Sequence, residues 1–456
     1  MNATICVLAA GKGTRMRSAL PKVLHPLAGK PLISHVLSAA RGFSATPPVV
    51  VYGHGGEQLQ AALADQPIHW IEQREQLGTG HAVAQALPAL PDDAPILILF
   101  GDVPLISERT LRALFEASRD SGFALLTALL ADPVGYGRIV RDADGKILRI
   151  VEHKDASPSQ RAINEINTGI MVIKGAYLHR WLPQLANDNA QGEYYLTDCV
   201  ERAVAEGIEV VGVLAQSETE ITGVNDRLQL ASLERAFQLA QASDLMRAGV
   251  TLADPARFDL RGELTCGPDS FIDVNCIFEG QVTLGAGVRI GANCIIANAR
   301  LADGVHVLPN SLIDGAVIGA DARIGPFARI RPETELSAGV HIGNFVEIKK
   351  SRLGENSKAN HLAYVGDAEI GRNVNIGAGT ITCNYDGAAK HKTTIGDDVF
   401  IGSDTQLVAP VTVGNGVTIG AGTTVTDDVA PDRLVISRVR QKAIAGWKRP
   451  VKPKPG

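Results

Sequence analysis

The sequence predicts two folds in one chain: an α/β doubly wound, Rossmann-like domain, followed by a left-handed parallel β-helix of hexapeptide repeats. Over roughly the first 225 residues, short apolar runs alternate with amphipathic segments, as in a sheet covered by helices. After residue 250 an aliphatic residue recurs at every sixth position, a period that neither an α-helix nor a simple strand produces. The predicted parts are a first domain over 1–226, a linker helix over 227–249, a second domain over 250–440 and a C-terminal tail over 441–456.

The composition is that of an ordinary globular protein. Of 456 residues, 45% are hydrophobic and 20% charged, with a net charge of −5. No long basic run lies in the predicted domains, which argues against nucleic acid as a partner. No apolar stretch approaches the length of a membrane span, and we do not expect the first residues to be a signal peptide. The six cysteines show no C-x-x-C spacing or metal-ligand clustering, so we expect reduced thiols in a cytoplasmic protein.

Six apolar runs predict the strands of the first domain. They are residues 4–11, 47–55, 94–102, 123–130, 167–175 and 208–214. Their hydrophobicity is continuous rather than alternating, which indicates a parallel sheet buried on both faces. Helical spacing follows Pro31 and Ser107, two residues suited to a helix start. Ligands of such folds bind at the carboxyl ends of the strands.

A helix is predicted between the two domains. Leu230, Leu233, Phe237 and Ala240 share one helical face, and Gly249 suits the end of the helix.

The second domain is predicted from its repeat. The recurring positions are Ile272, Phe278, Leu284, Ile290, Ile296, Ile318, Ile324, Ile330, Leu336, Ile342, Ile348, Ile370, Ile376, Ile395, Ile401, Leu407, Val413, Ile419 and Val425. Glycine directly follows many of them, and we expect each aliphatic side chain to point into the coil. The polar stretch "SKANHLAYVGD", residues 357–367, interrupts the period. We expect it to protrude as a loop, either solvated or supplying catalytic side chains such as His361.

The loop "LAAGKGTRM", residues 8–16, follows the first predicted strand. It does not match a dinucleotide fingerprint, because Met16 stands at the third glycine position, and it is not a P-loop. Its glycines are interspersed with the cations Lys12 and Arg15, and a third cation, Lys22, follows the loop. Such a loop can bind phosphate through backbone N–H groups and balance its charge. A tight turn with solvated basic residues explains the same letters equally well.

The longer motif "LAAGKGTRM…LPKVLHPLAGKPLI", with "EQLGTGHAV" and "LILFGDVPLI", resembles the sugar-nucleotidyltransferases over the whole first domain. The resemblance implies nucleotide binding by Leu8, Ala9, Ala10, Gly11, Lys22, Phe100 and Gly101, with uracil recognised by Gln73, Gly78 and Thr79. It implies sugar contacts by Gly137, Glu152 and Asn167. It also implies that Asp102 and Asn225 hold Mg²⁺. Phe100 departs from the tyrosine that is frequent in close relatives.

The residue types agree with the implied chemistry. A sugar-1-phosphate oxygen attacks the α-phosphorus of a nucleoside triphosphate and expels pyrophosphate. The protein mainly positions the reactants, while Mg²⁺ and cations such as Arg15 and Lys22 neutralise charge. One carboxylate plus one amide suits Mg²⁺, which keeps several waters and phosphate oxygens. Taken alone, Asp102 could also be a turn residue.

The full chain resembles the bifunctional N-acetylglucosamine-1-phosphate uridyltransferase/glucosamine-1-phosphate acetyltransferases. The motifs in the second half are "RIRPETEL", "NFVEIKKS", "KANHLAYVGD", "NIGAGTITCNYDG", "IGSDTQLVAPV" and "LVISRVRQ". The resemblance makes His361 the general base for acetyl transfer, a role that suits the pKa of histidine. It implies sugar-phosphate binding by Arg331, Lys349, Tyr364 and Asn375, and acetyl-CoA binding by Ala378, Asn384, Tyr385, Ser403, Ala421 and Arg438. Asn360 departs from the glycine that is common before the histidine.

The resemblance therefore implies a homotrimer with the acetylation site between subunits. Its small-molecule substrates would be glucosamine-1-phosphate, acetyl-CoA, N-acetylglucosamine-1-phosphate and UTP. Two alternatives are a single-activity pyrophosphorylase with a regulatory or oligomerising β-helix, and a non-enzymatic nucleotide-sugar sensor or scaffold. The set Arg331, Lys349, His361, Asn384 and Tyr385 argues against the first, and the presence of Lys22 and Asp102 against the second.

Overall fold

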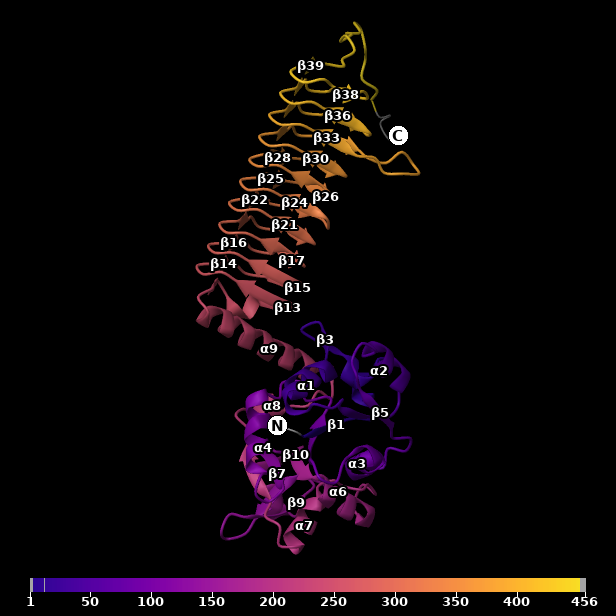
Figure 1. Ribbon diagram of the computed structural model, residues 1–456, viewed down its shortest axis with the longest axis vertical. Helices are drawn as coiled ribbons and strands as arrows, with labels where there is room; N and C mark the ends of the chain where they lie inside the picture. The colour runs from indigo at the N-terminus through magenta and orange to yellow at the C-terminus, as the bar shows by residue number, and fades with distance from the viewer. Residues whose placement is uncertain (1–2, 12, 452–456) are drawn as a thin grey trace. The chain divides into compact units, whose positions relative to one another are not determined.

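The computed structural model describes residues 3–11 and 13–451, so Lys12 and the last five residues of the predicted tail lie outside it. The chain divides into two compact units, Met1–Gln238 and Leu239–Gly456. Helix α9 (Arg227–Arg247) contains the division (Figure 1). Gly249 follows it with a φ of 97°, which glycine adopts without strain.

A nine-stranded sheet, counted over the described residues, forms the centre of the first unit. Its order is β11-β7-β10-β6-β1-β4-β5, with β8 beside β10 and β9 beside β8. The strands are β1 (Thr4–Ala9), β4 (Val49–Tyr52), β5 (His69–Glu72), β6 (Pro95–Phe100), β7 (Phe123–Leu129), β8 (Arg138–Arg141), β9 (Ile147–Val151), β10 (Glu165–Lys174) and β11 (Val211–Leu214). A small hairpin consists of β2 (Pro26–Leu27) and β3 (Lys30–Pro31).

Helices cover both faces of this sheet. They are α1 (Leu32–Ala40), α2 (Gly56–Ala62), α3 (Thr79–Ala86), α4 (Glu108–Ala117), α5 (Pro158–Arg161), α6 (Gly175–Trp181), α7 (Asp198–Ala205) and α8 (Glu218–Ile221). Along β6, Leu97 and Leu99 belong to one buried cluster, while Ile96 and Ile98 belong to the other. The side chains of this continuous apolar run therefore pack into a hydrophobic core on each face of the sheet. The Ser107 side chain accepts a hydrogen bond from the Thr110 N–H and caps α4, as predicted.

The sheet is mixed rather than purely parallel. β1 pairs in parallel with β4 and β6, whereas β10 runs antiparallel to both β6 and β7. The prediction of parallel direction for all six apolar runs was wrong for residues 167–175. Continuous hydrophobicity reports burial on both faces, and β10 is central whatever its direction. The edge strand β5 was not predicted, because its four residues are only partly buried or exposed.

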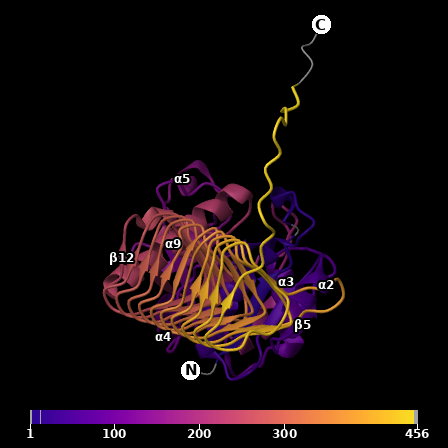
Figure 2. The same ribbon diagram turned by 90° about the horizontal axis from the view of Figure 1, so that it is seen from above.

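Parallel strands of the second unit stack into a β-helix, which confirms the predicted fold class. Figure 2 views the stacked coils from above. One face is an eleven-stranded sheet, counted over the described residues. It comprises β12 (Thr251–Leu252), β14 (Phe271–Ile272), β16 (Arg289–Ile290), β19 (His306–Val307), β22 (Arg323–Ile324), β25 (His341–Asn344), β28 (Lys358–His361), β31 (Asn375–Ile376), β34 (Phe400–Ile401), β37 (Thr418–Ile419) and β39 (Leu434–Val435).

The other two faces begin at the long strands β13 (Phe258–Cys266) and β15 (Cys276–Leu284), because β15 pairs with both β17 and β18. One stack continues through β17 (Ile295–Ala297), β20 (Leu312–Asp314), β23 (Arg329–Ile330), β26 (Glu347–Lys349), β29 (Tyr364–Gly366), β32 (Ile381–Cys383), β35 (Gln406–Val408) and β38 (Thr424–Val425). The other continues through β18 (Arg300–Leu301), β21 (Ala316–Ile318), β24 (Thr334–Leu336), β27 (Arg352–Leu353), β30 (Ala368–Ile370), β33 (Thr393–Ile395) and β36 (Val411–Val413).

The predicted inward positions form the core of this β-helix. Every one of the recurring aliphatic and aromatic residues named above is buried, the most exposed being Ile370 at 5%. The glycines that follow them allow the coils to stack closely. A Cβ on Gly377 would lie 2.6 Å from the backbone of Gly402, and one on Gly402 would lie 2.5 Å from the backbone nitrogen of Ala421.

The expected protruding loop at residues 357–367 does not exist. This stretch forms β28 and β29, and Ala359 and Val365 fill the inward positions at 0% exposure. The period is kept, but five-residue steps from Ile348 to Leu353 and from Val365 to Ile370 shift its phase. A strict count of six misses such a step. The segment that projects from the coils lies instead between β32 and β33 (Figure 1).

Candidate active sites

Ten of the predicted residues of the first unit surround one cavity of about 380 Å³ at the carboxyl ends of β1 and β6. They are Leu8, Ala9, Ala10, Gly11, Lys22, Gln73, Gly78, Thr79, Phe100 and Asp102. The volume lies within the range of small-molecule sites. Val23, Gln76, Ala82 and Glu193 complete the lining and were not singled out in the sequence.

Three polar side chains meet at one side of this cavity. Lys22 Nζ donates hydrogen bonds to Asp102 Oδ2 and, at 3.2 Å, to Asn225 Oδ1. Only 12% of the Lys22 side chain and 19% of the Asp102 side chain are exposed. The two oxygens predicted to hold a metal thus converge on one cationic nitrogen. No cluster of three or more metal-ligating His, Cys, Asp or Glu side chains occurs in the part of the chain that the structure describes.

The glycine loop itself is open. Gly11 is exposed, and Gly13 has a φ of 58° with the Lys22 side chain packed against its Cα. Arg15 is exposed and has no hydrogen-bond or ion-pair partner within residues 3–11 and 13–451. Gly101 is buried directly before Asp102, where a Cβ would approach Val23 to 3.2 Å. The loop therefore exposes the backbone of Gly11 at the cavity, and Arg15 is exposed in the same loop.

The segment 193–197 crosses beside the predicted base site. The Gly80 N–H donates to Tyr194 O at 2.8 Å, and the Leu196 N–H donates to Thr79 Oγ1 at 3.2 Å. A Cβ on Gly78 would lie 2.6 Å from Tyr194 O, so only glycine fits there. No motif drew attention to this segment, because its role depends on a contact more than a hundred residues away in the chain.

The predicted sugar residues form a second cluster. Gly137 O accepts the Asn167 N–H at 2.8 Å, and a Cβ on Gly137 would lie 3.3 Å from Glu152 Oε1. The same Glu152 oxygen accepts the Thr197 hydroxyl at 3.2 Å. Burial raises the pKa of Glu152. The Phe100 ring, which lines the cavity, packs against Gly169 two residues beyond Asn167.

In the second unit, four predicted residues stack on successive coils. The register of β28, β31, β34 and β37 extends from His361 to Ala378, then to Ser403 and Ala421. Backbone bonds follow the same order, with the Asp404 N–H donating to Ala378 O and the Gly422 N–H to Ser403 O. Arg438 Nε donates to Ala421 O at 3.2 Å. His361, Ser403 and Ala421 are exposed, as a groove for an extended ligand requires.

His361 occupies a defined orientation. Its Nδ1 lies 2.9 Å from Asn344 Oδ1, and Asn344 is its partner in the register of β25 and β28. An amide oxygen only accepts, so the neutral imidazole carries its proton on Nδ1 and leaves Nε2 as the basic nitrogen. The neighbouring Asn360 has a buried Oδ1 without a hydrogen-bond partner among the described residues.

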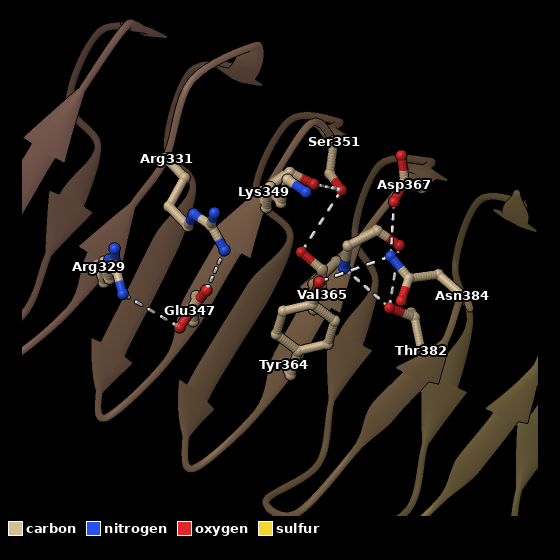
Figure 3. A network of polar contacts seen from close by, with 11 residues as sticks. Arg329, Arg331, Glu347, Lys349, Ser351, Tyr364, Val365, Asp367, Thr382 and Asn384 are labelled. Carbon is tan, nitrogen blue, oxygen red and sulfur yellow. Dashed lines mark hydrogen bonds and ion pairs between the residues drawn. The ribbon is translucent and has the colours of Figure 1, made fainter. Parts of the chain in front are cut away.

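A row of charged side chains lies on the face built from β23, β26 and β29 (Figure 3). Arg331 Nη1 donates to Glu347 Oε1 at 2.8 Å. The contact with Lys390 lowers the pKa of Lys349, with Arg331 adding to the effect. An anion bound beside Lys349 and Arg331 would offset the repulsion between these cations. Lys390 lies on the projecting segment and was not predicted.

Asn384 and Tyr364 meet on the same face (Figure 3). Asn384 is 7% exposed, and its Nδ2 donates to Asp367 Oδ2 at 2.5 Å and contacts Tyr364 Oη at 3.5 Å. Nδ2 thus has partners within the protein, whereas Oδ1 has no hydrogen-bond partner in the described part of the chain. Tyr385 is 60% exposed and donates to Gly387 O. Asn375 is half-buried at the start of β31.

Family models match both units. Residues 5–152 match the MobA-like NTP transferase domain, and residues 392–427 match the bacterial transferase hexapeptide (six repeats). Residues 260–338 match the GMPPB C-terminal domain. All six cysteines are free thiols. None of the helices in the described part of the chain has the length and hydrophobicity that a membrane span needs.

Curated relatives match almost the whole chain. The protein of Cupriavidus pinatubonensis named "Bifunctional protein GlmU" is 60% identical over 448 residues, 98% of this chain and 99% of its own. A relative of the same name from an Azoarcus species is 60% identical over the same shares of each chain. Another, from Aromatoleum aromaticum, is 59% identical over 452 residues, 99% of each chain.

Proposed function

The chain belongs to the bifunctional GlmU family, and we propose from this premise that it makes UDP-N-acetylglucosamine in two steps. The second unit acetylates glucosamine-1-phosphate with acetyl-CoA. The first unit then joins N-acetylglucosamine-1-phosphate to UTP and releases pyrophosphate. The enzyme is thus both an acyltransferase and a nucleotidyltransferase, and it uses a nucleotide and acetyl-CoA.

One observation supports the proposal: in each unit by itself, several of the predicted residues lie close together. Ten of them line the cavity of the first unit. Four others follow one column of the β-helix, beside the cationic face of Arg331 and Lys349. A β-helix that only regulates or oligomerises requires neither a histidine with one free basic nitrogen nor a cluster of cations on the adjoining face.

In the first site, the chain mainly binds and orients. Backbone of the open loop at Gly11, together with Arg15 and Lys22, faces the triphosphate and balances the charge that develops on the leaving pyrophosphate. Gln73, with Gly78 and Thr79, holds the base. Glu152 and Asn167 hold the sugar so that its phosphate oxygen is aimed at the α-phosphorus.

Asp102 and Asn225 fit a magnesium ion. Their oxygens already converge on the Lys22 ammonium, and carboxylate and amide oxygens are suitable donors for Mg²⁺. When bound, the ion would neutralise phosphate charge and orient the triphosphate. Lys22 would then turn toward the phosphates.

In the second site, His361 Nε2 takes the proton released when the sugar amine attacks the thioester carbonyl of acetyl-CoA. Asn344 keeps Nδ1 protonated and fixes the ring. Arg331 and Lys349 bind the phosphate, while Tyr364 and Asn375 hold the sugar. The column of Ala378, Ser403 and Ala421, with Asn384, Tyr385 and Arg438, receives the coenzyme.

We further propose a homotrimer with this site between subunits. Support comes from three exposed apolar side chains at one corner of the coils: Phe327, Phe345 and Leu362, which are 49%, 57% and 61% exposed. The rings of Phe327 and Phe345 stack at 5.3 Å, and Leu362 is adjacent to His361. Contiguous exposed apolar side chains are typical of protein interfaces. We also propose that residues 227–249 are a linker helix between the two domains. A cytoplasmic location is proposed because free thiols persist there.

A product assay tests this function. The purified chain is incubated with glucosamine-1-phosphate, acetyl-CoA, UTP and Mg²⁺, and free CoA, pyrophosphate and UDP-sugar are followed separately. Release of both CoA and pyrophosphate, with UDP-N-acetylglucosamine as product, supports both activities. Pyrophosphate without CoA, and only when N-acetylglucosamine-1-phosphate is supplied, would leave a single-activity pyrophosphorylase.

A further inference from the structure

The orientation of the Gln73 carboxamide is determined by its neighbours. Gln73 is 2% exposed, and its Nε2 lies 3.1 Å from Gly78 O and 3.0 Å from His81 Nδ1. A backbone carbonyl can only accept a hydrogen bond. The carboxamide nitrogen must therefore face Gly78, and it has one further N–H to donate.

That second N–H determines the tautomer of His81. Since Gln73 donates, Nδ1 of His81 must accept, and the neutral ring carries its proton on Nε2. In the structure, Gln85 Nε2 lies 3.2 Å from His81 Nε2. Because His81 Nε2 is then a donor, the Gln85 carboxamide is turned over so that its oxygen accepts. The bonds then run in one direction, from His81 to Gln85 and from Gln73 to both His81 and Gly78. The His81 ring lies beside Tyr194, with ring centroids 6.3 Å apart.

The side-chain oxygen of Gln73 is available to a ligand. No hydrogen-bond partner for Oε1 occurs among the described residues, and Gln73 lines the cavity. An acceptor at this place complements the N3–H donor of uracil. Cytosine presents an acceptor at N3, so its lone pair would oppose that of Oε1.

We propose that His81 is a positioning residue that makes the first site select uracil over cytosine, by holding the Gln73 oxygen toward the base. This inference rests on the proposed uridylyl transfer. Without an acceptor at position 81, one N–H of a buried carboxamide has no partner inside the protein. Rotation toward the cavity then satisfies this N–H and presents a donor, which suits the N3 of cytosine.

Two substitutions distinguish the effect of the hydrogen-bond acceptor of His81 from the effect of its aromatic ring. His81→Phe keeps a ring beside Tyr194 but has no acceptor, whereas His81→Asn keeps an acceptor near the place of Nδ1 but loses the ring. His69→Leu, at an exposed histidine of β5, is the matched control. The full chain is assayed with N-acetylglucosamine-1-phosphate and Mg²⁺, with UTP or CTP, and circular dichroism checks folding.

The ratio of kcat/KM for UTP to that for CTP is the measured quantity. We expect His81→Phe to lower this ratio about tenfold or more, since one orienting hydrogen bond is lost. His81→Asn and His69→Leu should keep the wild-type ratio. A structural role alone would lower both rates equally and leave the ratio unchanged.

The inference is overturned if His81→Phe keeps the wild-type ratio. It is also overturned if the ratio falls only in His81→Asn, because the ring and not the acceptor would then matter. If His81→Phe does not fold, His81→Leu also lacks the acceptor and should show the same lowered ratio. A wild-type chain that transfers no uridylyl group from UTP would instead overturn the proposed function, and this inference with it.

Discussion

Replacing Lys22 with methionine tests the polar centre of the first site. Lys22 Nζ is the cation that meets both Asp102 and Asn225, and the Lys22 and Asp102 side chains are only 12% and 19% exposed. Methionine keeps the length of the side chain but leaves the Asp102 carboxylate without its cation. Removing one partner of a buried ion pair costs about 3 kcal/mol or more. We expect the unfolding free energy of the first unit to fall by about 3 kcal/mol in EDTA.

Magnesium should restore most of this loss. If Mg²⁺ takes the place of the ammonium, it stabilises the folded state by about 2.7 kcal/mol at a concentration a hundred times its Kd. The wild-type chain should respond less, since there the ion must displace Lys22. Urea unfolding with and without Mg²⁺ can be followed by the fluorescence of Trp181, which is fully buried in the first unit.

The second activity provides an internal control. Lys22→Met should lower uridylyl transfer by about 100- to 1000-fold, the usual effect of losing one group that stabilises transition-state charge. Acetyl transfer by the same chain should be unchanged. The double variant Lys22→Met/Asp102→Asn should lose the response to Mg²⁺. Equal stability of Lys22→Met and wild type in EDTA, or an equal response to Mg²⁺, would refute the reasoning.

Three further predictions follow from other parts of the chain. His361→Ala should lower acetyl transfer by about 100- to 10,000-fold while uridylyl transfer to supplied N-acetylglucosamine-1-phosphate persists; a parallel loss of both would contradict separate sites. Burial raises the pKa of Asp198 from 3.8 to about 6, so the folded state binds more protons than the unfolded state between these values, and stability should fall as pH rises through this window. In Asp198→Asn, the free energy of unfolding measured in urea should depend less on pH between pH 4 and 7. Near neutrality it should exceed the wild-type value by about 1 kcal/mol, a figure reduced because Asp198 is partly exposed. An unchanged dependence on pH would contradict this prediction. Ile342→Ala, at 0% exposure in the coils, should destabilise the β-helix by about 2–5 kcal/mol, whereas Ile342→Val should cost about 1 kcal/mol; thermal unfolding distinguishes them, and equal losses would argue against a packing origin.

Local patterns predicted much of the fold. The apolar run at 94–102 predicted β6, Ser107 predicted the start of α4, and the recurring aliphatics predicted the interior of the β-helix. The direction of β10 was mispredicted, because a strand buried on both faces has the same composition in either direction. The loop expected at 357–367 was mispredicted because five-residue steps shift the period without ending it.

For the sites, too, the sequence indicated individual residues but not the contacts between them. The resemblance supplied Asp102 and His361 as candidate residues, but not their partners. Lys22 meets Asp102 across 80 positions of sequence, and Asn344 meets His361 across 17. His81 has no motif of its own and acquires a role only through the orientation of Gln73.

The sequence by itself determined where strands, helices and coils occur, since burial periodicity and capping act between residues that are close in the chain. The tertiary structure alone decided which nitrogen of His361 is basic, which way the Gln73 carboxamide points, and that Ala378, Ser403 and Ala421 share one column. Hydrogen bonds have direction and a reach of about 3 Å. They can therefore form only after folding has brought distant residues to that distance in the required orientation.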